Sequence, residues 1–251
     1  MGVFNIFLMP GNYNSFMRYM PQEKVCRVWS GDLSYAIGLI ASDGCLSKDG
    51  RHIYFVSKDL DMVMNLKQAL KIEVAIYRTR RGNSLEKKYY SINFSDKVFY
   101  EFLNQIGLTS AKSKTIQEVL VPEELFPDFL RGLFDGDGSF YTFWDKRWPS
   151  SFGFKLTFAS ASSNFIYWLK ERNAYIFEVN GFVHKGAGVL NLEYTKGDSK
   201  RLIKAMYHSP IALFLRRKRD KIESALTSDA LLHQNRRDSL TVKPSPEERV
   251  K

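Results

Sequence analysis

Apolar residues recur at intervals of three and four in two related stretches, LSYAIGLIASDG at 33–44 and DFLRGLFDGDGS at 128–139. This spacing places the apolar side chains on one face of a helix, so each stretch predicts a helix. Ser30 or Asp32 is suitably placed to cap the first of them. We interpret the two helices as equivalent elements of an internal repeat.

Small residues lie four apart on one face of each predicted helix, where they allow two helix backbones to pack closely. They are Gly38, Ser42, Gly132 and Gly136. A glycine follows each helix, Gly44 in the first repeat and Gly138 in the second, and we expect both to adopt the left-handed conformation that ends many helices.

The rest of the chain alternates between strand and helix patterns. Strands are predicted over 52–57, 74–80, 88–94, 139–143, 152–160, 175–183 and 189–195. Helices are predicted over 59–71, 95–107, 162–173, 198–208 and 213–226. Ser95 is the expected N-cap of the helix at 95–107, and the strands at 74–80 and 88–94 are predicted to form a hairpin. The second half repeats the order of the first, which predicts an α+β protein.

The repeat also predicts how the chain divides. Asp43 and Asp137 occupy matching positions, and 137 − 43 gives 94 residues for each half, enough for a small α/β unit. We expect an N-terminal arm at 1–29, a first half at 30–114, a linker at 115–127, a second half at 128–226 and a polar tail at 227–251 whose last part is disordered.

The acids at the ends of the two helices are the first candidates for chemistry. Asp43 and Asp137 fall in the last turn, where the helix dipole makes a carboxylate unfavourable by about 0.3–1 kcal/mol. Two such acids on helices that pack together suggest a site for divalent cations, which prefer oxygen ligands. The alternative is that Asp-Gly simply ends a helix. An EF-hand does not fit, because Lys146, Arg147 and Trp148 stand where the loop should close.

Charge indicates the kind of partner. Lysine and arginine total 37 against 27 acids, a net charge of +10 that favours a polyanion. The alternative is a basic surface without a partner. Cys26 and Cys45 are too few for a disulfide framework, which weakly indicates a reducing compartment. The four histidines follow no zinc-binding spacing, and no apolar run approaches the length of a membrane span.

Alternation in the predicted strands separates an apolar face from a polar one. In the strand at 152–160, Lys155 and Thr157 oppose phenylalanines and a leucine, and Asn191 opposes apolar residues in the strand at 189–195. Polar sheet faces of this kind suit contacts with bases and phosphates, although a solvated face would give the same pattern. In the strand at 74–80 the pattern does not show which face of the sheet carries Arg78 and Arg80.

The segments AIGLIASDG (36–44) and LRGLFDGDG (130–138) resemble the two name-giving motifs of the LAGLIDADG homing endonucleases, in the form with both copies on one chain. The resemblance implies two pseudo-symmetric αββαββα halves, with the motif helices packed at the centre and two antiparallel sheets forming a DNA-binding saddle. It makes Asp43 and Asp137 the metal-binding acids. The motif's earlier acid is kept as Asp135 but replaced by Ala41 in the first copy.

The resemblance also implies a lysine beside the scissile phosphate in each half, and position matching selects Lys114 and Lys218. These four residues, Asp43, Asp137, Lys114 and Lys218, are the predicted catalytic residues. Lys58 is a weaker polar candidate, since Ala161 stands in its place in the second half. The expected DNA contacts are Arg78, Arg80, Lys88, Lys155, Thr157, Asn191 and Arg216. Taken singly, each basic residue at 112–114 and 216–219 is as consistent with an ordinary phosphate clamp or a solvated charge as with a catalytic role.

These observations together favour an intracellular, site-specific double-strand DNA endonuclease that acts as a monomer on a long asymmetric site. The expected cofactor is Mg²⁺, with Mn²⁺ substituting and Ca²⁺ supporting binding without efficient cleavage. Two other functions are compatible with the sequence: an RNA maturase that assists splicing of its host intron, and a regulator that binds DNA without cutting it. Retention of both motif acids argues against the regulator.

Overall fold

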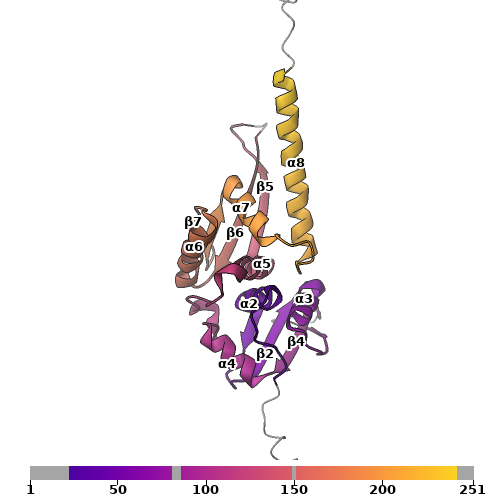
Figure 1. Ribbon diagram of the computed structural model, residues 1–251, viewed down its shortest axis with the longest axis vertical. Coiled ribbons are helices and arrows are strands. Elements are labelled where there is room, and N and C mark those ends of the chain that lie inside the picture. The colour runs from indigo at the N-terminus through magenta and orange to yellow at the C-terminus, as the bar shows by residue number, and fades with distance from the viewer. Residues whose placement is uncertain (1–22, 81–85, 149–150, 242–251) are drawn as a thin grey trace, which may run out of the picture.

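The computed structural model describes residues 23–80, 86–148 and 151–241. Two helices pack together at the centre, and a four-stranded antiparallel sheet with its own helices lies on either side of the pair (Figure 1). The α+β architecture with two similar halves is therefore confirmed. The first half comprises α2 (Gly31–Asp43), β1 (Gly44–Leu46), β2 (His52–Ser57), α3 (Leu60–Leu70), β3 (Tyr77–Thr79), β4 (Tyr89–Ser95) and α4 (Lys97–Gln105). The second comprises α5 (Phe126–Asp137), β5 (Gly138–Trp144), β6 (Phe152–Ser160), α6 (Ser163–Phe177), β7 (Phe182–Lys185), β8 (Leu190–Tyr194), α7 (Lys196–Met206) and α8 (Arg216–Thr241).

The central pair, α2 and α5, packs backbone against backbone, as the small residues predicted. A Cβ atom added to Gly38 would lie 2.2 Å from the carbonyl oxygen of Phe129. One added to Gly132 would lie 2.1 Å from the carbonyl oxygen of Tyr35. No side chain larger than glycine's hydrogen fits at either position, so these two residues set how closely the halves approach.

The expected left-handed ends of these helices are wrong. Gly44 has φ −77° and ψ 149°, and Gly138 has φ −76° and ψ 154°, so both are extended and each begins a strand directly. Glycine is required at both positions because a side chain would clash with the preceding helix, and not because of a positive φ. A Cβ atom on Gly44 would lie 2.7 Å from the Ile40 carbonyl oxygen, and one on Gly138 would lie 2.5 Å from that of Phe134.

Both sheets have the same strand order, β1-β2-β4-β3 in the first half and β5-β6-β8-β7 in the second. One face of each sheet is covered by helices, α3 and α4 in the first half and α6 and α7 in the second. Apolar side chains of the strands lie on these covered faces, with Phe55, Ile92, Leu156 and Leu192 fully buried. The alternate residues lie on the opposite, open face of each sheet.

Several element predictions differ from the structure. The strand predicted at 175–183 lies further along the chain: α6 continues to Phe177, ends where Glu178 adopts a left-handed conformation (φ 53°), and the strand, β7, begins only at Phe182. The N-cap of α4 is Asp96, whose carboxylate accepts a bond from the Phe99 N–H, and Ser95 is the last residue of β4. The short strand β1 was not identified from the pattern.

The predicted boundaries of two helices also differ. The second motif helix starts at Phe126, two residues before the expected start of the second half at 128, with Pro127 in its first turn, where proline is tolerated. The last helix was expected to end at 226 but continues to Thr241. It runs beside β5, away from the centre of the molecule (Figure 1).

The arm and the tail lie partly outside the described residues, which leave out 1–22 and 242–251. The described end of the arm is held by Asp96, whose Oδ2 accepts bonds from the N–H groups of Lys24 (2.7 Å) and Val25 (3.0 Å). Within the described parts of the chain, no helix combines the length and apolar character needed to cross a bilayer.

Candidate active site

The ends of α2 and α5 bring the two predicted acids into one site. A Cβ atom on Gly136 would lie 1.9 Å from the Ser42 Oγ and 3.4 Å from the Asp43 Oδ2, so the last turns of the helices are in contact. Asp43 is half-buried, and the Asp137 side chain reaches solvent. The next residues, Cys45 and Ser139, lie on the open faces of the two sheets. The acids therefore lie where the open faces meet the central helices.

The environment of the acids is electrostatically unfavourable for two negative charges. Desolvation, and then the neighbouring Asp43 carboxylate, raise the pKa of Asp137 to about 6, while Lys112 and Lys218 act in the opposite direction. A divalent cation with oxygen ligands would relieve this repulsion, so the two carboxylates fit such an ion. In the described residues, no third acid, histidine or cysteine joins them to form a larger ligand cluster.

A lysine from each half bonds the carbonyl oxygen of the glycine that follows the acid. The Lys112 Nζ lies 2.6 Å from the Gly44 oxygen, and the Lys218 Nζ lies 2.7 Å from the Gly138 oxygen. Both side chains are buried, at 4% and 9% exposed. Lys218 is thus where position matching expected it, but its counterpart is Lys112. Lys114, on the same short 3₁₀ turn, is exposed. Sequence alone offers two lysines in Lys112-Ser-Lys114, and only the turn of the backbone distinguishes them.

A buried polar network determines where Lys218 lies. The Asp135 Oδ2 accepts hydrogen bonds from the Tyr35 hydroxyl (2.8 Å) and the Leu215 N–H (2.7 Å). Arg131 donates to the carbonyl oxygens of Leu213 (2.8 Å) and Met206 (2.7 Å). These contacts hold the segment that leads into α8. Burial raises the pKa of Asp135 to about 6 despite these bonds. The sequence identified Asp135 only as the earlier acid of the motif, and it did not single out Arg131.

The comparisons with known proteins agree with this geometry. Residues 31–107 match the model of the LAGLIDADG-like domain. The homing endonuclease I-WcaI bound to its DNA recognition sequence aligns with a TM-score of 0.55 and 13% identity, covering 86% of this chain and 95% of that one. The chain has the two-repeat LAGLIDADG fold.

Other solved structures share the LAGLIDADG fold. The meganuclease I-AabMI bound to uncleaved DNA has a TM-score of 0.55 and 14% identity, covering 80% of this chain and 91% of its own. The meganuclease I-SmaMI bound to uncleavable DNA has a TM-score of 0.52 and 17% identity, covering 78% and 91%. No curated protein matches the sequence.

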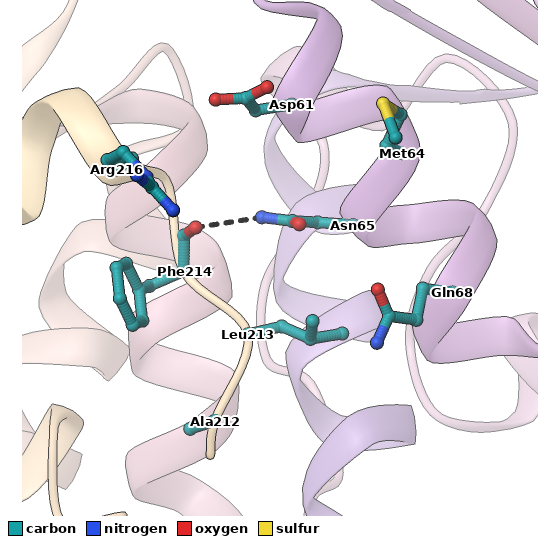
Figure 2. Close-up of a pocket in the computed structure, with 8 residues that line it drawn as sticks. All are labelled: Asp61, Met64, Asn65, Gln68, Ala212, Leu213, Phe214 and Arg216. Carbon is teal, nitrogen blue, oxygen red and sulfur yellow. Dashed lines mark hydrogen bonds between the residues drawn. The ribbon is translucent and has the colours of Figure 1, made fainter. Parts of the chain in front are cut away.

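The two LAGLIDADG halves are also joined beside the central pair, at a pocket of about 520 Å³ between α3 and the segment before α8. Figure 2 shows Asn65 reaching from α3 to the carbonyl oxygen of Phe214, at 2.9 Å. The same amide lies 3.3 Å from the Tyr35 hydroxyl. Next to this pocket, Arg217 of α8 makes a two-pronged ion pair with Asp59, at 2.9 and 2.7 Å. The start of α8 is therefore fixed by both halves.

The open face of the second LAGLIDADG sheet carries three of the expected DNA-contact residues. The Lys155 Nζ is paired with the Glu193 carboxylate at 2.7 Å, Asn191 is half-buried, and Thr157 is buried. Aromatic side chains share this face and were not predicted. Tyr141 and Phe182 are 55% and 58% exposed there.

The other expected contacts are more dispersed. Arg78 of β3 is opposite Tyr90 of β4, and Tyr90 packs against the core. Arg78 therefore lies toward the covered face of the first sheet, while Tyr77 and Thr79 lie on the open face. Arg80 is exposed just beyond β3, and Lys88 pairs with Glu86 at 2.8 Å. Arg216 lines the pocket beside α3 (Figure 2). Lys58 lies over the ring of Tyr89, 5.6 Å from its centroid.

Proposed function

We propose that this chain is a site-specific double-strand DNA endonuclease that requires a divalent metal ion. The observation that carries the proposal is the meeting of Asp43 and Asp137 at the ends of the crossed helices, with a buried lysine from each half beside them. The neighbours I-WcaI and I-AabMI are bound to DNA in their structures, which supports duplex DNA as the partner here. The net charge of +10 agrees with a polyanion.

In the proposed mechanism Asp43 and Asp137 hold the cations, because hard divalent ions prefer carboxylate oxygens. When bound, Mg²⁺ supplies positive charge to the phosphate oxygens and makes water more acidic. A lysine ammonium group beside the acids donates hydrogen bonds in the site and stabilises the negative charge that develops on the phosphate. The open sheet faces bind the duplex on either side and hold the scissile phosphates at the acids.

The proposal includes three finer expectations. Mn²⁺ should substitute for Mg²⁺, and Ca²⁺ should support binding with little cleavage because its looser coordination misplaces the reacting oxygens. One chain should bind one asymmetric site, since Ala41 and Asp135 already make the halves different.

The experiment begins with a library of randomised duplexes, from which the protein selects a bound sequence in Ca²⁺. That sequence is placed in a supercoiled plasmid and incubated with Mg²⁺. Cleavage should fall by orders of magnitude in Asp43→Asn and in Asp137→Asn, while DNA affinity holds or rises because a negative charge is removed. Asp32→Asn, an exposed acid in the first turn of α2, is the matched control and should cut normally.

Two results would contradict the proposal. A selected sequence that is bound tightly but never cut in Mg²⁺ or Mn²⁺ would indicate a DNA-binding regulator. Cleavage at close to the parent rate by either acid variant would show that the paired carboxylates do not act together.

A further inference from the structure

The two buried lysines of the site differ in how many of their ammonium protons are already used. A lysine ammonium carries three donors and no acceptor. Lys218 bonds three carbonyl oxygens, those of Phe134 (2.6 Å), Gly138 (2.7 Å) and Gly136 (3.1 Å). Among the described residues, Lys112 bonds one, that of Gly44. The pseudo-symmetric lysines are therefore not chemically equivalent.

We propose that Lys112 is the lysine that contacts the reacting phosphate, that Lys218 is instead a structural cap of α5, and that the two DNA strands are consequently cut at unequal rates. This inference rests on the proposed function, and it assigns different roles to two residues that the pseudo-symmetry would treat alike.

The buried state of Lys112 favours a ligand. Its side chain is 4% exposed, and buried donors are almost always paired. Two of its protons have no acceptor in the described structure, while Asp137 and Asp43 interact with its charge. A phosphate oxygen brought to the acids would supply the missing acceptor and would form a charge-assisted hydrogen bond.

The contacts of Lys218 instead resemble those of a helix cap. The carbonyl groups at the end of α5 carry the negative end of the helix dipole, and a lysine there is stabilising. Its ammonium also lies 5.1 Å from the centroid of the Phe134 ring. Donating to a phosphate would require Lys218 to give up one of its three carbonyl bonds, whereas Lys112 gives up none.

The difference has an origin in the two motif copies. Asp135 accepts a bond from the Leu215 N–H, and so holds the start of α8 against the end of α5. Ala41 occupies the equivalent position in the first half and has no side-chain acceptor. The turn that carries Lys112 is therefore not drawn against α2 in the same way.

The test compares Lys112→Met and Lys218→Met on a duplex labelled on each strand and on a supercoiled plasmid. Lys112→Met should keep the parent's melting temperature and DNA affinity, yet slow the cutting of one strand by about 10²-fold, so that nicked circles accumulate. Lys218→Met should melt at a lower temperature and, below that temperature, cut both strands in the parent's ratio. Lys204→Met, an exposed lysine at the end of α7, controls for the loss of one positive charge.

Three results would overturn the assignment. Lys112→Met could cut both strands at the parent's rate, or it could slow the cutting of both strands equally. Alternatively, Lys114→Met, and not Lys112→Met, could slow the cutting of one strand. If Lys218→Met fails to fold, the relative rates at which Lys112→Met cuts the two strands test the assignment by themselves. A parent protein that cuts nothing would refute the proposed function before this test begins. With an active parent, the pattern of the variants tests only the lysines.

Discussion

Glycines in the central helix pair are required because any side chain would clash with the backbone of the opposite helix. Gly132→Ala would place a methyl group 2.1 Å from the Tyr35 carbonyl oxygen, and backbone on both sides leaves nothing flexible to move. We expect a loss of about 3 kcal/mol in the free energy of unfolding, or failure to fold. Gly38→Ala should behave alike.

The matched control for these variants is Gly197→Ala, in the first turn of α7, where an added Cβ meets no atom within 4 Å. Alanine there should be neutral or stabilising by up to about 1 kcal/mol. Urea denaturation followed by circular dichroism compares the three variants. Parental stability in Gly132→Ala would show that the helices do not cross by backbone contact.

At this scale the sequence predicts residues whose role follows from type and spacing. Asp43 and Asp137 could be found because both repeat the same unfavourable helix-end position. Lys112 could not be found from the sequence. Whether Lys112 or Lys114 points into the site depends on the left-handed conformation of Ala111 (φ 58°), which begins the turn. Arg131 could not either, because it bonds carbonyl groups far along the chain, which no local pattern encodes.

Helix α8 depends on contacts at its start and in its middle. In its middle, Asp229 is 2% exposed and pairs with Lys196 and with Lys200, the latter at 2.6 Å. Burial alone would raise the pKa of Asp229, but the hydrogen bonds from these lysines and their positive charges lower it below the ordinary value. A lowered pKa contributes stability that is present above the ordinary carboxyl value of about 4 and is lost as the pH falls through the folded value.

Asp229→Asn should therefore destabilise the protein by about 2 kcal/mol at neutral pH. The difference from the parent should shrink as the pH falls below about 4, because the carboxylate of the unfolded chain then takes up a proton before that of the folded chain does. Asp220→Asn, at an exposed acid on the same helix, should show no such dependence. Melting curves over a pH series measure both, and a gap that is independent of pH would contradict the assignment.

The start of α8 is held to the first half by Arg217 and Asp59, whose two-pronged geometry is stronger than that of an ordinary surface pair. A double-mutant cycle with Arg217→Gln and Asp59→Asn should give a coupling energy of about 1 kcal/mol. The pair Lys97 and Glu101, 3.7 Å apart within α4, should give about 0.3 kcal/mol. Equal couplings would mean that Arg217 does not join the halves.

The elements themselves were predictable where the period was clear. Strand β6 matches its predicted bounds, 152–160, because apolar and polar residues alternate along it. The segment after residue 173 was misread as a strand because its aromatic and β-branched residues suit either state, and the helix continued through tertiary packing. Strand β1 has three residues, too few for any period to be recognised.

The whole molecule presents two open sheet faces and a net charge of +10. Binding along a duplex would displace condensed counterions, and each neutralised phosphate adds roughly 0.9 to the slope of log affinity against log salt. We expect a steep decline in affinity between low and physiological salt. Titrations of the selected duplex at several salt concentrations measure the slope, and a nearly flat dependence would argue against a surface that spans the DNA.

The glycine-to-carbonyl contacts between α2 and α5 do not by themselves distinguish one partner helix from another, because they involve backbone atoms alone. A chimaera that joins one half of this chain to a foreign half could keep the crossing intact. What it would lose are specific side-chain contacts: the acceptor that Asp135 offers to Tyr35 between the central helices, and, beside them, the Asn65 amide and the Asp59 carboxylate. Compatibility between grafted halves should therefore depend on these few polar side chains.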